Sequence, residues 1–339
     1  ISLDAFCHLL RSPMLAEECS VVSGCSHLVV DLNQPLTETS HQTRQSEISW
    51  QPNTVVIGLC DEPVTALADS TQALLPFIDL IADSTTADFL LDAALNNIVR
   101  HPMASAALVQ VLRQSLTVSV EQALILESLT YSSLQHGAEF MGWLKDRATP
   151  KPQAQAQGIE PVVLCDRQAA NLTVTLNRPA KHNAFSATVR DGLTEALLLA
   201  SADTSLKQVT LKGAGPSFCA GGDLDEFGEA RNATVAHLTR TTRSPGRLIY
   251  RLGDKVHARL HGACIGAGIE MTAFAKRVVA KDDAFFALPE VGFGLVPGAG
   301  GTVSIPRRIG THRTALLGLS GQRIDTALAL NWGLIDAIE

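Results

Sequence analysis

Two glutamates beside glycine-rich turns are the residues of this sequence best suited to chemistry. Glu270 follows a turn of small residues at 266–268 and lies in an apolar run. Glu290 ends a second apolar run at 285–289. A buried carboxylate is costly unless it is paired or chemistry requires it. The alternative is that each glutamate is an ordinary surface or ion-paired residue.

The glycine-rich turns predict backbone N–H groups that lack partners. The turn at 266–268 leads into a helix start, where the first N–H groups have no acceptor within the helix and the dipole is positive. A second turn at 219–223 contains Gly222, and a third at 298–302 opens another helix. Amide donors aimed at a thioester carbonyl stabilise an enolate, and each contributes on the order of 10²–10³ in rate. Alternatively, these segments are only tight turns.

Strands that alternate with helices must position these turns. Apolar runs predict strands at 27–32, 54–59, 172–176, 207–212, 256–260, 277–280 and 284–288. Apolar residues at helical spacing predict helices over 75–81 and 90–98. Ser186 can cap another helix, and Ser119 with Gln122 forms a capping box for a helix at 119–135. This alternation predicts an α/β fold with a largely parallel sheet.

A segment rich in Pro, Gln and Ala at 148–160 predicts a linker that divides the chain into two parts. The polar segments 36–52 and 224–247 predict loops. The pattern LxVxLNxP occurs at 28–35 in the first part and again at 172–179 in the second. This repeat predicts a duplication, although a match so short can also arise by chance.

Four motifs make residues 168–339 resemble the crotonase (enoyl-CoA hydratase/isomerase) superfamily. In chain order they read LNRPAKHNAFS, GPSFCAGGDLDEF, HGACIGAGIEM and FALPEVGFGLVPGAGGT. The resemblance implies a ββα superhelix body that binds acyl-CoA and holds the thioester carbonyl between the N–H groups of Gly222 and Ala267. Many relatives have glycine where Ala267 stands, so a methyl group enters the pocket here. Glu270 and Glu290 would act on a water molecule and on the α-carbon.

The resemblance also implies a set of substrate and coenzyme A contacts, namely Lys181, Ala184, Ala220 and Asp223. Lys181 follows the first strand of the body, where the family often meets coenzyme A phosphates, but a solvated charged loop is equally consistent. Asp223 either orders the turn at Gly222 or touches substrate. Neither Cys219 nor Cys264 has a histidine nearby in the sequence, so a nucleophilic thiol is not favoured.

The order of segments departs from the family's pattern. Relatives usually continue for several helices beyond the body, whereas this sequence stops at Glu339. Residues 119–147 resemble those helices, yet they precede the body. We therefore expect three units: a degenerate, mainly helical crotonase-like half at 1–147, a linker, and a catalytic body at 161–339. The first-part helices are expected to pack on a catalytic body, either of their own chain or of a neighbour in a homo-oligomer, for which a trimer or hexamer is possible.

Composition excludes several classes of protein. The 339 residues are 46% apolar and carry a net charge of −7, which argues against a nucleic-acid surface. No apolar run is long enough to span a membrane, and no signal peptide is visible, although the sequence starts without methionine and a native N-terminus can be missing. The seven cysteines are scattered and form no CxxC pair. We therefore expect free thiols in a cytoplasmic protein that has no metal site.

These observations predict a hydratase or dehydratase that acts on an enoyl-CoA or 3-hydroxyacyl-CoA thioester. Such an enzyme needs no redox cofactor, because coenzyme A enters only as part of the substrate. An isomerase, hydrolase or C–C lyase acting on a CoA thioester shares the same amide donors and is a second prediction. A non-catalytic acyl-CoA-binding or assembly protein is a third, because the degenerate first half carries no catalytic motif.

Overall fold

The computed structural model describes most of the chain, namely residues 1–34, 36, 51–147, 161–230 and 232–339. The predicted linker at 148–160 and most of the predicted loop at 36–52 lie outside the described residues. None of the described helices is both long and apolar enough to cross a membrane.

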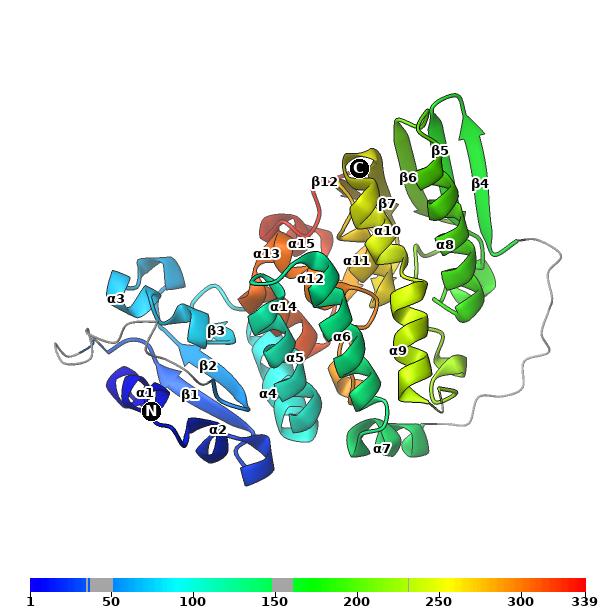
Figure 1. Ribbon diagram of the computed structural model, residues 1–339. Coiled ribbons are helices and arrows are strands. Elements are labelled where there is room, and N and C mark those ends of the chain that lie inside the picture. Colours follow the sequence, from blue (N-terminus) through cyan, green and yellow to red (C-terminus); the bar gives the residue numbers. More distant parts are fainter. Residues whose placement is uncertain (35, 37–50, 148–160, 231) are drawn as a thin grey trace.

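A six-stranded sheet forms the framework of the second part (Figure 1). Its strands, in spatial order, are β12 (Ala337–Ile338), β9 (Arg277–Ala280), β7 (Val256–Leu260), β6 (Gln208–Gly213), β5 (Asn171–Leu176) and β4 (Val163–Gln168). All neighbouring pairs are parallel except β4 with β5. The predicted, largely parallel sheet is therefore confirmed, with β4 as an edge strand that the apolar pattern did not predict.

A smaller sheet explains why the two glutamate turns meet. It consists of β11 (Ile324–Asp325), β10 (Phe285–Ala287) and β8 (Ala263–Ile265). The chain passes from β7 to β8 and into helix α11 (Ala267–Thr272), and then from β9 to β10 and into the 3₁₀ turn η9 (Glu290–Phe293). Strands β8 and β10 are parallel neighbours, so α11 and η9 leave the same edge of the sheet side by side.

The first part carries its own three-stranded parallel sheet. Its strands are β1 (His27–Asp31), β2 (Val55–Leu59) and β3 (Leu80–Ala82), in that order. Helices α1 (Leu3–Leu10), α2 (Leu15–Glu18) and α3 (Asp69–Gln72) belong to the same part. The β1–β2 and β5–β6 pairs are both parallel and both carry the repeated sequence pattern. The duplication itself stays a prediction.

Two secondary-structure predictions are wrong. Residues 75–81 do not form a helix: a 3₁₀ turn at 75–77 precedes β3, because Leu80 and Ala82 are buried and pair with β2. The predicted loop at 224–247 contains α9 (Ala233–Thr242) and the start of α10 (Pro245–Leu252). The Asn232 side chain caps α9, which packs on α6 (Val120–Leu134) through polar side chains, so an apolar pattern does not reveal it.

Four helices of the first part pack against the second part of the same chain (Figure 1). They are α4 (Asp88–Arg100), α5 (Pro102–Ser115), α6 and α7 (Ala138–Asp146). Their partners include η9, α9, α12 (Gly301–Ser304) and α14 (Thr311–Ser320), while α8 (Ala187–Ala202) packs on α10 and on strands β4 and β5. The remaining short helices are α13 (Pro306–Ile309) and α15 (Thr326–Trp332). The capping box of Ser119 and Gln122 is present at the start of α6, as predicted.

Candidate active site

The side chains of Glu270 and Glu290 meet at Gly266. Both are buried, with exposed fractions of 2% and 9%. Gly266 has a φ of +48°, and a Cβ atom there would lie 2.4 Å from Glu290 Oε1 and 3.6 Å from Glu270 Oε1. A glycine is therefore required at this position, both for its backbone conformation and for the space that the carboxyl groups occupy. The two predicted carboxyls do face one small volume.

Glu270 is held by the backbone of the third glycine-rich turn. Its Oε2 atom accepts hydrogen bonds from the N–H groups of Ala299 (2.7 Å) and Gly301 (2.9 Å). Its Oε1 atom lies on the side of Gly266. Burial raises the pKa of Glu270 to about 7, although the backbone hydrogen bonds act in the opposite direction. Near neutral pH, this carboxyl can therefore both lose and hold a proton.

Glu290 lies in a different electrostatic environment. Its Oε2 atom is buried and has no hydrogen-bond partner among the residues that the structure describes. Burial raises the pKa of Glu290 well above its usual value, and the nearby Glu270 raises it further. The Glu290 carboxyl therefore holds its proton to a higher pH than an exposed glutamate does, which suits a proton donor.

Gly222 and Ala267 present N–H groups near these carboxyls. Gly222 and Phe185 form a parallel β-bridge. The Phe185 N–H donates to Gly221 O, and the Asp223 N–H donates to Phe185 O. The N–H of Gly222 takes no part in this bridge and points away from Phe185. Ala267 is the first residue of α11, and its N–H has no acceptor within that helix. Gly222, Ala267 and both glutamates line one cavity of about 570 Å³. That volume suits a small-molecule ligand.

An aromatic cluster supports both the Gly222 turn and the Glu290 turn. Trp143 of α7 lies 4.8 Å from Phe293 of η9 and 5.9 Å from Phe227, measured between ring centroids. The Phe227 ring in turn packs on Gly222, where a Cβ atom would lie 2.7 Å from its edge. A first-part helix therefore braces two elements of the site.

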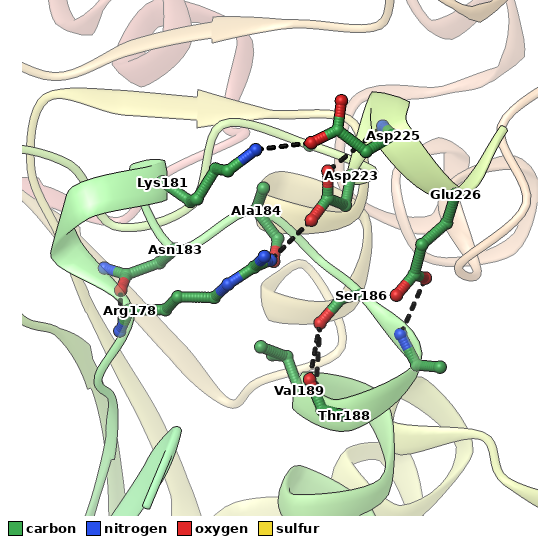
Figure 2. Close-up of polar contacts among 12 residues, drawn as sticks. Arg178, Lys181, Asn183, Ala184, Ser186, Thr188, Val189, Asp223, Asp225 and Glu226 are labelled. Atoms are coloured by element: carbon green, nitrogen blue, oxygen red, sulfur yellow. Dashed lines mark hydrogen bonds and ion pairs between the residues drawn. The ribbon is translucent and has the colours of Figure 1, made fainter. Parts of the chain in front are cut away.

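The predicted substrate contacts separate into two groups. Asp223 lines the cavity, and its carboxylate accepts hydrogen bonds from Arg178 (2.5 Å) and from the N–H of Asp225 (3.1 Å), so it also orders the turn (Figure 2). Lys181 pairs with Asp225 of the same turn (Figure 2). Lys181, Ala184 and Ala220 are not among the residues that line the cavity.

A third buried glutamate, Glu127 of α6, was not predicted. It is 2% exposed and accepts hydrogen bonds from the Gly300 N–H (2.8 Å) and from the N–H (2.9 Å) and Oγ1 (2.7 Å) of Thr302. Burial, followed by the nearby charge of Glu270, raises the pKa of Glu127 to about 8. A signal existed in the sequence, because Glu127 shares one helix face with Val120 and Ala123, at spacings of seven and four residues.

The lining of the cavity includes a further unpredicted pair, Tyr131 of α6 and Arg240 of α9. The Arg240 guanidinium lies 4.6 Å from the centre of the Tyr131 ring and donates hydrogen bonds to Ser128 and Ser132. Burial raises the pKa of the Tyr131 hydroxyl. The pair joins α6 to α9 at the edge of the cavity.

The cysteines and possible metal ligands add no further chemistry to this site. Cys219 and Cys264 are fully buried, and burial raises the pKa of both thiols, to about 12 for Cys219. Such thiols stay protonated and are poor nucleophiles. Within the described ranges, no cluster of three or more His, Cys, Asp or Glu side chains could hold a metal ion.

Comparison with known proteins gives a consistent family match over the second part. The family model described as enoyl-CoA hydratase/isomerase matches residues 166–339. The chain is 34% identical over 179 residues to 2,3-dehydroadipyl-CoA hydratase of Escherichia coli K12, a match that covers 52% of this chain and 68% of that enzyme. It is 35% identical to mevalonyl-coenzyme A hydratase of Beauveria bassiana, covering 49% of this chain and 62% of that enzyme.

A crystal structure of an enoyl-CoA hydratase/isomerase from Mycobacterium abscessus is 29% identical, with a TM-score of 0.49 over 52% of this chain and 70% of that one. Across seven curated relatives, the match spans between 55% and 68% of the relative's length.

Proposed function

The chain belongs to the enoyl-CoA hydratase/isomerase family, and on that premise we propose that it adds water to an enoyl-CoA thioester and catalyses the reverse dehydration. One observation carries the proposal: two buried carboxyls, Glu270 and Glu290, share a single small volume at Gly266. Paired carboxyls in different protonation states are what the addition of water to a double bond requires.

In the proposed hydration, the oxygen of a water molecule attacks Cβ while Glu270 takes one of its protons. The electron pair of the C=C bond moves toward Cα and the thioester carbonyl, whose oxygen becomes negatively charged. The N–H groups of Gly222 and Ala267 stabilise that oxygen, and each donor of this kind typically contributes on the order of 10²–10³ in rate. Glu290 then gives its proton to Cα.

The proposed roles agree with the electrostatics of the two carboxyls. With a pKa of about 7, Glu270 is substantially ionised at neutral pH and can act as a base. The pKa of Glu290 is raised well above its usual value, which favours the protonated form that can supply Cα. After the addition, the proton gained by Glu270 can pass to Glu290 near Gly266, which restores both starting forms.

Two considerations favour hydration over the other reactions of CoA thioesters. The sequence resemblance implies that relatives with other chemistry often lack one of the two glutamates, and this chain has both. Several relatives are also named as hydratases. Isomerase, hydrolase or C–C lyase activity on a CoA thioester is the enzymatic alternative. Simple acyl-CoA binding is the non-catalytic alternative, and the experiment with crotonyl-CoA separates it from catalysis.

In this proposal, coenzyme A lies along the two segments that carry Lys181, Ala184 and Ala220, outside the 570 Å³ cavity that receives the acyl group. Asp223 holds the turn between the two regions through Arg178. The homo-oligomer and the cytoplasmic location that the sequence led us to expect stay predictions.

The test is incubation of the purified chain with crotonyl-CoA, followed by the loss of the enoyl-thioester absorbance. We expect the wild-type protein to consume crotonyl-CoA, and we expect Glu290→Gln to bind CoA thioesters without turnover. Calorimetric titration with a saturated acyl-CoA measures that binding separately. A folded wild-type protein that binds acyl-CoA but consumes no enoyl-CoA would be a binding protein, and the proposal would fail.

A further inference from the structure

We propose that Glu127 is a positioning residue, whose carboxyl fixes the loop at residues 299–302 so that this loop can fix the carboxyl of Glu270. The last link, from the position of Glu270 to catalysis, rests on the proposed function. The first link, from Glu127 to the loop, stands on hydrogen bonds alone.

The hydrogen bonds of the loop alternate between the two glutamates. The N–H groups of Ala299 and Gly301 donate to Glu270 Oε2, whereas those of Gly300 and Thr302 donate to the two oxygens of Glu127. Four consecutive N–H groups therefore point alternately to two carboxyls from different elements. A displacement of either carboxyl must move the backbone that the other one uses.

The loop needs an anchor because its own sequence gives it little stiffness. Gly300 has a φ of +109°, a conformation that only glycine adopts readily, and such residues lose much conformational freedom on folding. Gly301 lies so close to Glu270 that a Cβ atom there would be 2.6 Å from Glu270 Cγ. Larger residues cannot stiffen this segment without displacing Glu270, so an external side chain must hold it.

Glu127 is well suited to be that side chain. It comes from α6, which packs on α12, and its Oε2 atom also accepts a hydrogen bond from Thr302 Oγ1. A surface carboxylate that only capped the short helix α12 would have no reason to be buried. Glu127 is instead buried near Glu270, Glu290, Tyr131 and Arg240. Burying a carboxyl beside other carboxyls is unfavourable, and such groups are concentrated at functional sites.

The experiment compares Glu127→Gln, Glu127→Ala and the control Glu121→Gln in the full chain. Gln places an NH₂ group opposite one backbone donor and so loses one of the loop bonds, whereas Ala loses both. Glu121 lies on the same helix but pairs with Arg251 at the surface, so its change removes a charge without touching the loop. Amide hydrogen exchange over 298–302 reports the loop, and kcat and KM for crotonyl-CoA, per folded molecule, report the effect on Glu270.

We expect exchange over 298–302 to accelerate in both Glu127 variants and to stay unchanged in Glu121→Gln. We also expect kcat to fall by about 10²-fold in Glu127→Ala and by less in Glu127→Gln, with KM changing far less, because the lost interaction orients a catalytic group. If the Ala variant does not fold, the nearly isosteric Gln variant decides the question.

Two results would overturn the proposal. One is an amide hydrogen-exchange rate over 298–302 in Glu127→Gln that equals the wild-type rate. The other is a lower melting temperature in that variant with an unchanged kcat per folded molecule, which is the behaviour of a residue that contributes only to stability. If the wild-type chain converts no enoyl-CoA, the proposed function fails, but the exchange measurement still decides whether Glu127 fixes the loop.

Discussion

Replacing Glu270 by glutamine should stabilise the protein at alkaline pH. Burial raises the pKa of Glu270 from 4.5 to about 7, so the folded protein holds this proton to a higher pH than the unfolded chain does. The resulting stabilisation is fully present below pH 4.5, is lost as the pH rises toward 7, and is absent above it. Above that range, the folded wild-type protein must bury a carboxylate.

The magnitude follows from this pKa difference. Each pKa unit corresponds to about 1.36 kcal/mol, so the rise from 4.5 to about 7 corresponds to ~3 kcal/mol in the free energy of unfolding. A glutamine stays neutral, and its side-chain oxygen can still accept the bonds from Ala299 and Gly301. The neutral glutamine also removes the negative charge that raises the pKa of Glu127, and this too stabilises the folded variant at alkaline pH.

Urea unfolding at pH 5 and pH 9 measures the effect, with Glu121→Gln as the control. We expect Glu270→Gln and the wild type to have similar free energies of unfolding at pH 5, and the variant to be more stable by about 3 kcal/mol at pH 9. The control should not show this change between the two pH values. An equal difference between Glu270→Gln and wild type at both pH values would refute the reasoning, because it would mean that no buried charge is removed.

Four further predictions concern catalysis and assembly. Gly222→Pro should lose on the order of 10²–10³ in turnover relative to Gly222→Ala, because only proline lacks the N–H; circular dichroism checks the fold, and equal turnover of the two variants would exclude the amide-donor role. The Glu270→Gln/Glu290→Gln double variant should lose little activity beyond the worse single variant, since the two carboxyls act as a unit; multiplied losses in steady-state rates would contradict this. The rate of hydration at low substrate concentration should rise with pH as Glu270 ionises, with a midpoint near pH 7. A flat pH–rate profile would argue against Glu270 as the base. Residues 161–339 expressed alone should be poorly soluble or inactive, and residues 1–147 added as a separate chain should restore solubility or activity in part; a soluble, fully active fragment would show that the first part is dispensable.

The sequence predicts those features of the fold that depend on local patterns. In strands β5, β7 and β9, apolar residues alternate with polar ones or follow one another over lengths typical of strands. The structure has these strands within one residue of their predicted bounds. The starts of the helices after Ser119 and Ser186 are predicted by the capping residues themselves. In the site, the glycine-rich turns single out Glu270 and Glu290, whereas the pairing of β8 with β10 that brings the two turns together was not predicted.

The features that the sequence did not predict depend on contacts between distant segments. The region before β3 has apolar residues at spacings that suit a helix as well as a strand, and only pairing with β2 decides between them. Helix α9 is polar because it packs on α6 through Arg240 and serine side chains. Glu127 lies on the apolar face of its helix, but its hydrogen-bond partners are identified only when the loop at 299–302, more than 170 residues later, is placed against it.

The order of segments along the chain also has a consequence for synthesis. Glu127 and its partner Gly300 are 173 residues apart, and at about 5–20 residues per second the ribosome needs on the order of 10–30 s to produce the second after the first. During that interval α4, α5 and α6 have already emerged, but α12 and α14, which cover their apolar faces, have not. The nascent chain therefore carries an uncovered helical surface, and misassociation between ribosome-bound copies competes with folding until residues 301–320 have emerged.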